Sequence, residues 1–123
     1  MKIQTSKGVV SAEGNLITIL LNDDIHLQAS DIVELQDAMI NLSQGNAHVV
    51  LLISGDGSTI SKEALHLMHS KAWSQQLIAM ALVVNLVAQN YITQLFETEN
   101  KTGIPTAAFS TKSKALNWLK LLY

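Results

Sequence analysis

Two unbroken apolar runs, at residues 49–53 (VVLLI) and 77–84 (LIAMALVV), constrain the fold of this chain more than any other feature. An apolar run without polar alternation suits a strand that is covered on both faces, as in the parallel sheets of α/β proteins. Segments with helical spacing follow both runs, which favours right-handed crossovers between parallel strands. We therefore expect these two strands to lie side by side, in the same direction, in the middle of one sheet.

Shorter segments complete the predicted sheet. Residues 9–13 and 16–21 are typical of two strands joined by a Gly14-Asn15 turn, which favours an antiparallel hairpin. A last short strand is expected at residues 107–109, after Pro105. Helices are expected to begin near residues 30, 61, 85 and 110. The sequence thus predicts a single α/β domain over residues 1–123, with a mostly parallel five-stranded sheet and the order ββαβαβαβα.

The C-terminal segment carries a more specific pattern. Phe109 ends the predicted last strand, Thr111 caps the following helix, and Ala115, Trp118 and Leu119 form an Ala-x-x-Trp-Leu block. With the order of elements, this pattern resembles the STAS-like family typified by bacterial anti-sigma-factor antagonists, and especially its short stand-alone bacterial members of unknown function. The resemblance implies a βα superhelix with its helices mostly on one side of the sheet. It also implies a phosphorylated serine, in an Asp-Ser-Ser or similar triplet, after the third strand.

The segment that corresponds to this triplet is a glycine-rich loop at residues 54–61 (SGDGSTIS), which lacks the triplet itself. A loop at the carboxyl edge of a parallel sheet can bind anions through free N–H groups and a helix N-terminus. This loop matches neither a dinucleotide fingerprint nor a P-loop. It is explained either as a flexible turn with Ser61 as helix cap, or as a site of phosphorylation, partner contact or small-anion binding. The candidate residues are Ser54, Asp56, Ser58, Thr59 and Ser61.

A second candidate surface lies on the next predicted helix, where His66, His69 and Trp73 share one face. We expect this face to contact a protein partner. Two imidazoles at this spacing could share a metal ion, but Glu63 is the one further ligand nearby, so no metal site is expected. The chain contains no cysteine, no G-x-S-x-G elbow and no paired-carboxylate signal. We therefore expect no catalytic residues, no cofactor and no enzyme activity.

Charge and composition limit the classes of partner. A net charge of −2 with 15% charged residues leaves no basic stripe for a phosphate backbone, which argues against nucleic acid. A hydrophobic content of 48% favours burial against a second copy, so a homodimer is expected. No apolar run approaches the ~20 residues that span a bilayer. The first ten residues also lack the apolar core of a signal peptide, so we expect no membrane span and a cytoplasmic location.

These observations predict a non-catalytic regulatory or protein-interaction domain that responds to phosphorylation in the loop of residues 54–61. The alternative is a carrier of a small apolar or anionic ligand. The two differ in one structural feature: a carrier needs an apolar cavity on the order of a few hundred cubic ångströms. An interaction domain instead has a filled core and a flat apolar patch.

Overall fold

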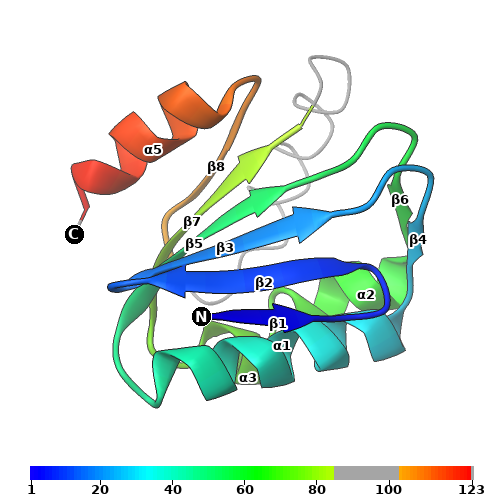
Figure 1. Ribbon diagram of the computed structural model, residues 1–123, viewed down its shortest axis with the longest axis horizontal. Helices are drawn as coiled ribbons and strands as arrows, with labels where there is room; N and C mark the ends of the chain where they lie inside the picture. Colours follow the sequence, from blue (N-terminus) through cyan, green and yellow to red (C-terminus); the bar gives the residue numbers. More distant parts are fainter. Residues whose placement is uncertain (85–102, 123) are drawn as a thin grey trace.

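The computed structural model describes residues 1–84 and 103–122, and a six-stranded sheet forms its centre (Figure 1). In spatial order, the strands are β1 (Lys2–Gln4), β2 (Gly8–Glu13), β3 (Leu16–Leu21), β5 (His48–Ile53), β7 (Leu77–Val83) and β8 (Thr106–Phe109). A second sheet pairs β4 (His26–Leu27) with β6 (Thr59–Ile60). The helices are α1 (Ala29–Ser43), α2 (Lys62–Leu67), α3 (Lys71–Ser74) and α5 (Lys112–Lys120).

The main sheet is mixed, so the prediction of a mostly parallel five-stranded sheet is wrong. Strand β2 pairs antiparallel with both β1 and β3, whereas the pairs β3–β5, β5–β7 and β7–β8 are parallel. The order ββαβαβαβα is wrong as well, because β1 precedes the hairpin and because β4 and β6 add two further strands. These three strands are two or three residues long, and cross-strand contacts rather than their own apolar pattern hold them in place. The helix predicted to begin at Asn85 lies outside the described residues.

The two apolar runs form neighbouring parallel strands in the interior of the sheet, as predicted, although β7 lies next to the edge strand β8. Strands β5 and β7 are parallel neighbours, with Val50 opposite Met80 and Leu52 opposite Leu82. The predicted hairpin is confirmed too, since β2 and β3 pair antiparallel across the Gly14-Asn15 turn. The order of parallel strands brings the carboxyl ends of β3 and β5 to the same edge of the sheet, and their amino ends to the opposite edge.

Helices cover both faces of this sheet (Figure 1). On one face, α1, α2 and α3 contribute to the larger apolar core, which contains Ile32, Leu35 and Trp73. On the other face, α5 packs Ala115 and Leu119 against β5 and β7. Among residues 1–84 and 103–122, no helix combines the length and hydropathy that a bilayer-spanning helix needs.

The C-terminal pattern has a structural role in attaching α5. The Thr111 hydroxyl accepts a hydrogen bond from the backbone N–H of Lys114 at 3.2 Å, so Thr111 caps the helix as predicted. The rings of Phe109 and Trp118 lie with their centroids 5.6 Å apart at an angle of 48°. This tilted contact joins the end of β8 to α5. Packing therefore accounts for the residues that carry the resemblance.

One exposed carboxylate holds the turn between β1 and β2 against α1. Glu34 accepts hydrogen bonds from the hydroxyl of Ser6 at 2.6 Å and from its backbone N–H at 3.0 Å. The hydroxyl bond, followed by the backbone bond, holds the pKa of Glu34 below its usual value. A carboxyl whose pKa is lowered by folding stabilises the contact above its unfolded-state pKa, and this contribution is lost as pH falls through the folded pKa.

We expect Glu34→Gln to speed hydrogen exchange at the Ser6 amide near neutral pH, because the amide loses a charged acceptor. In wild type, protection of this amide should fall as pH drops through the lowered pKa, whereas in the variant it should be flat. Exchange measured by NMR and corrected for intrinsic rates gives both values. The matched control is Glu13→Gln, at an exposed position at the end of β2. Equal protection in wild type and Glu34→Gln would contradict the prediction.

Candidate functional site

The loop predicted as a site is hydrogen-bonded to a second loop at the carboxyl edge of the sheet. We call residues 22–25 and 54–58 the paired loops. The backbone N–H of Asp24 donates to the carbonyl of Asp56 at 2.7 Å, and the N–H of Asp56 donates to a carboxylate oxygen of Asp23 at 2.9 Å. The hydroxyl of Ser58 donates to the carbonyl of Asn22 at 3.3 Å. The loop is therefore held in place rather than free.

Strands β4 and β6 continue this pairing beyond the loops. The N–H of Thr59 donates to Ile25, and that of Ser61 to Leu27, both at 2.9 Å. The side chains add a contact of 2.7 Å between Nδ1 of His26 and the hydroxyl of Thr59. The hydroxyl of Thr59 is thus already engaged, although its residue is exposed.

Two glycines explain why the paired loops can approach so closely. A Cβ on Gly55 would overlap the carbonyl oxygen of Asn22. Gly57 has a φ of +73°, in the left-handed region, and a Cβ there would overlap the carboxylate of Asp24. The glycines of this loop therefore serve close packing between two loops, which is a different use from cradling a phosphate.

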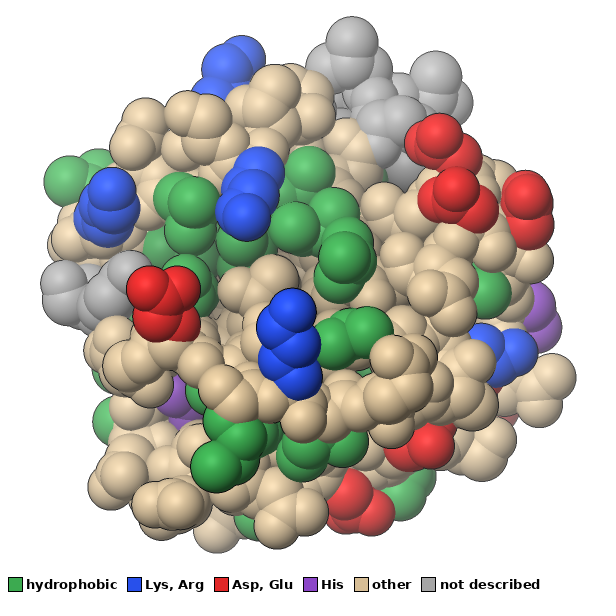
Figure 2. Space-filling model, viewed as in Figure 1, with side chains coloured by type: hydrophobic (Ala, Val, Ile, Leu, Met, Phe, Trp, Pro, Cys, Tyr) green, Lys and Arg blue, Asp and Glu red, His purple; other side chains and the backbone are tan. Residues whose placement is uncertain are grey.

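The paired loops present a concentration of negative charge. Asp23, Asp24 and Asp56 are all exposed, and they come from adjacent turns. Figure 2 shows acidic side chains gathered at the upper right, where these loops lie in Figure 1.

The hydroxyl groups of two other predicted loop residues are already engaged. The hydroxyl of Ser54 donates to the carbonyl of Val83 at 3.2 Å. Ser61 caps α2 by accepting from the N–H of Ala64 at 3.1 Å, which confirms its predicted capping role.

The structure divides the predicted interaction face of His66, His69 and Trp73. His66 is exposed, and His69 is half-buried with Nδ1 2.8 Å from the carbonyl of Leu65. Trp73 is 1% exposed and belongs to the core, so it offers no contact surface. The reason is a break in the helix: the hydroxyl of Ser70 caps α3 and starts a new helix that carries the Trp73 ring inward. Within the described ranges, no group of three or more potential ligands could hold a metal ion.

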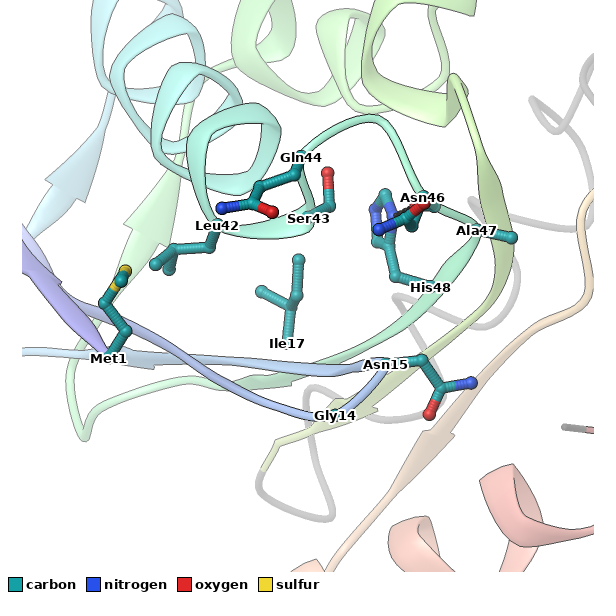
Figure 3. Close-up of a pocket in the computed structure, with 10 residues that line it drawn as sticks. All are labelled: Met1, Gly14, Asn15, Ile17, Leu42, Ser43, Gln44, Asn46, Ala47 and His48. Atoms are coloured by element: carbon teal, nitrogen blue, oxygen red, sulfur yellow. Dashed lines mark hydrogen bonds between the residues drawn. The ribbon is translucent and has the colours of Figure 1, made fainter.

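Sequence reasoning missed a pocket at the amino edge of the sheet. It measures about 360 Å³ and lies between the β2–β3 turn, the end of α1 and the start of β5 (Figure 3). Its lining residues are Met1, Gly14, Asn15, Ile17, Leu42, Ser43, Gln44, Asn46, Ala47 and His48. The sequence feature that could have indicated this pocket is a set of amide side chains at two turns, Asn15 at one and Gln44 and Asn46 at the other. His48 follows the second turn, directly before an apolar strand.

A comparison with protein-family models places nearly all of the chain in one family. The matching model is a domain of unknown function, DUF7793, and the match extends over residues 10–122. A comparison with curated proteins finds none that matches this chain. Because the family match leaves out only the first nine residues and the last one, the chain belongs to the DUF7793 family.

Proposed function

We propose that this domain is a non-catalytic regulatory module that binds a protein partner through the paired loops. The observation that carries the proposal is the hydrogen-bonded pairing of the two loops, which holds Asp23, Asp24 and Asp56 together at one edge of a rigid sheet. Functional residues on loops held by a rigid scaffold are common in binding domains. The exposed carboxylates call for a partner with a basic contact surface, because complementary charge speeds and orients docking.

Ser58 is the residue through which phosphorylation would act on this surface. Its hydroxyl donates to Asn22, and a phosphate ester has no proton to donate there. The phosphate would also bring nearly two negative charges next to the carboxylates of the paired loops. Helix α2 is only six residues long, so its N-terminus provides little compensation. Phosphorylation of Ser58 is therefore expected to separate the paired loops and to weaken partner binding.

The test uses Ser58→Asp and Ser58→Ala as a matched pair. We expect Ser58→Asp to weaken partner binding at least tenfold, because it separates the paired loops that the partner contacts. The added negative charge attracts a basic partner only weakly, since salt screens it beyond ~10 Å. Ser58→Ala should keep binding within a few-fold, and both variants should unfold within about 1 kcal/mol of wild type. Partners are captured from extract of the source cells on immobilised wild type, both variants and Asp56→Asn, then quantified by mass spectrometry.

Two results decide the outcome of this experiment. A basic-surfaced protein held by wild type and Ser58→Ala, but lost from Ser58→Asp and from Asp56→Asn, supports the proposal. Identical capture by all four proteins would overturn it. The control for a general charge effect is again Glu13→Gln, which removes an exposed carboxylate away from the paired loops.

The relation to STAS-like domains and the homodimer stay predictions. The family match names a domain of unknown function and does not connect it to STAS-like proteins. For the homodimer, the apolar side chains Leu20, Leu121 and Leu122 are exposed, at 52%, 82% and 37%. Such side chains are typical of protein surfaces when scattered, so they give the dimer no specific support.

The alternative function, a small-ligand carrier, has one observation in its favour, which is the pocket of about 360 Å³. Its lining contains no lysine or arginine to balance an anion, and about half of the lining residues are polar. The pocket therefore favours an uncharged polar ligand over the apolar or anionic one expected from the sequence.

A further inference from the structure

We propose that the half of the sheet left uncovered by α5 docks an amphipathic helix of a protein partner, and that this helix has acidic flanks. The apolar side chains on this half and at its border with α5 are Val9, Leu16, Leu20, Ile53 and Leu116, and we call them the open sheet face. The proposal concerns a different surface from the paired loops and does not rest on the function proposed for them.

The described helices leave one face of β2 and β3 open. Ile17 and Ile19 point into the larger core, so the alternate residues Leu16, Thr18 and Leu20 point to the opposite face. Helix α5 packs on that face, but it lies mainly on β7 and reaches β5 and β8. Leu20 therefore stays 52% exposed.

The open sheet face is continuous across three strands. Val9 of β2 lies opposite Leu20 of β3, and Leu20 lies opposite Ile53 of β5. Leu16, Ile53 and Leu116 pack against the smaller apolar core, which extends the row to the flank of α5. Figure 2 shows a group of hydrophobic side chains between the positions of α5 and β2 in Figure 1. Apolar side chains grouped in this way, unlike scattered ones, mark interaction surfaces.

The spacing of the elements favours a helix as the occupant. Strand β3 is the second strand from β7, so the two strands lie about 10 Å apart. Packed helices have axes about 8–10 Å apart, so a helix over β3 would fit beside α5, which lies over β7. The apolar side of this helix would cover Leu16 and Leu20 on the sheet and Leu116 on α5.

One flank of α5 borders the open sheet face with two lysines. Lys112, Leu116 and Lys120 are spaced four residues apart, so they share one flank of the helix. The opposite flank carries Trp118, whose ring contacts Phe109 on the edge strand β8. The flank with Leu116 and the two exposed lysines therefore faces the uncovered half of the sheet.

The far border of the open sheet face is also basic. Lys2 on β1 is exposed, and it points to the same face because its neighbour Ile3 packs against the larger core. Within β1, β2 and β3, alternation places one carboxylate on this face, that of Glu13 at the end of β2. Lysines on both borders outnumber it, so the charge of the face is complementary to a helix with acidic flanks.

The test uses two synthetic peptides of about five helical turns that share one leucine stripe. Glutamate flanks the stripe in one peptide, and lysine flanks it in the other. Amide NMR of the full chain follows Leu16, Thr18 and Leu116, whereas binding of the lysine peptide to the acidic paired loops is read separately at Asp24 and Asp56. We expect saturable shifts with the glutamate peptide and at least tenfold weaker binding of the lysine peptide at the first three amides. No saturable shifts with the glutamate peptide, or equal binding of both peptides, would overturn the proposal.

Charge reversal on α5 tests the contribution of its lysines. The double variant Lys112→Glu with Lys120→Glu should reverse the preference, so that the lysine peptide binds the open sheet face more tightly. The matched control, Lys62→Glu with Lys71→Glu, reverses two charges on α2 and α3 and should keep the wild-type preference. Leu20→Ser, at an exposed position, should weaken binding of the glutamate peptide at least fivefold. An unchanged preference in the α5 variant, or unchanged affinity in Leu20→Ser, would contradict the proposal.

Two other occupants of the open sheet face give different results. A membrane surface would retain the protein on vesicles of phosphatidylcholine and phosphatidylserine, and the double charge reversal on α5 would release it. A second copy of the chain would shift the amide of Leu20 as protein concentration rises, with no peptide present. Either result without saturable binding of the glutamate peptide would overturn the proposal in favour of that occupant.

Discussion

Replacing Gly55 with alanine is expected to separate the paired loops and to lower the free energy of unfolding by about 1–3 kcal/mol. The added Cβ would overlap the carbonyl oxygen of Asn22, lie 2.6 Å from its carbonyl carbon and lie 2.8 Å from Cα of Asp23. All three are backbone atoms, so no side-chain rotation relieves the overlap and one loop must move. The movement should break the hydrogen bonds that join Asp56 to Asp24 and to Asp23.

The matched control for Gly55→Ala is Gly45→Ala. Gly45 has a φ of +77° but no atom within 4 Å of an added Cβ, so alanine there meets backbone strain without a clash. It should cost about 1–2 kcal/mol and leave the paired loops intact. Urea unfolding gives the stabilities, and hydrogen exchange at Asp24 reports on the loops. Gly55→Ala should raise that exchange rate strongly and reduce partner binding, while Gly45→Ala should change neither. Unchanged exchange in Gly55→Ala would show that the loops are not packed as described.

The parts of the fold that the sequence predicts are those with strong local signals. Strands β5 and β7 are continuous apolar runs, and the caps at Ser61 and Thr111 are hydroxyl residues directly before helical spacing. Helix α1 begins at Ala29, slightly before the predicted cap at Ser30 or Asp31, because the Asp31 carboxylate accepts from the N–H of Gln28 instead of ending the loop. The exact first residue of such a helix depends on the conformation of one side chain, which cannot be inferred from the spacing of apolar residues.

The missing parts depend on contacts between distant segments. Strand β1 has one apolar residue, Ile3, and pairs because β2 presents an open edge. The Asp23-Asp24 segment is typical of a solvated turn, and its role in the site comes from Asp56, more than thirty residues away. The pocket likewise joins Asn15 with the loop before His48. Local periodicity carries no information about such pairings. The sequence therefore predicts the position of the loop at residues 54–61, but not the segment at residues 22–25 with which it pairs.

The largest single loss of stability is expected from Trp73→Ala, at about 3–5 kcal/mol. Trp73 is 1% exposed, and its side chain is the largest among the fully buried ones in the described part of the chain. Domains of this size are stable by about 5–15 kcal/mol, so the variant should lose a large share of that stability. Phenylalanine should cost less, about 1–2 kcal/mol. It keeps an aromatic ring and removes Nε1, which is buried without a hydrogen-bond partner in the described residues.

The exposed control for Trp73 is His66→Ala on α2, which should stay within about 0.5 kcal/mol of wild type. Urea unfolding followed by circular dichroism measures all three variants, and an unchanged slope against urea confirms that the same surface unfolds. The order of stability should be His66→Ala, then Trp73→Phe, then Trp73→Ala. If Trp73→Ala lowers the free energy of unfolding no more than His66→Ala does, the Trp73 ring must lie at the surface. Trp73 would then be available for partner contact together with His66 and His69, as expected from the sequence. A loss of about 3–5 kcal/mol would instead confirm that Trp73 is buried. Partner contacts on this segment would then be restricted to residues that precede Ser70, where α3 begins.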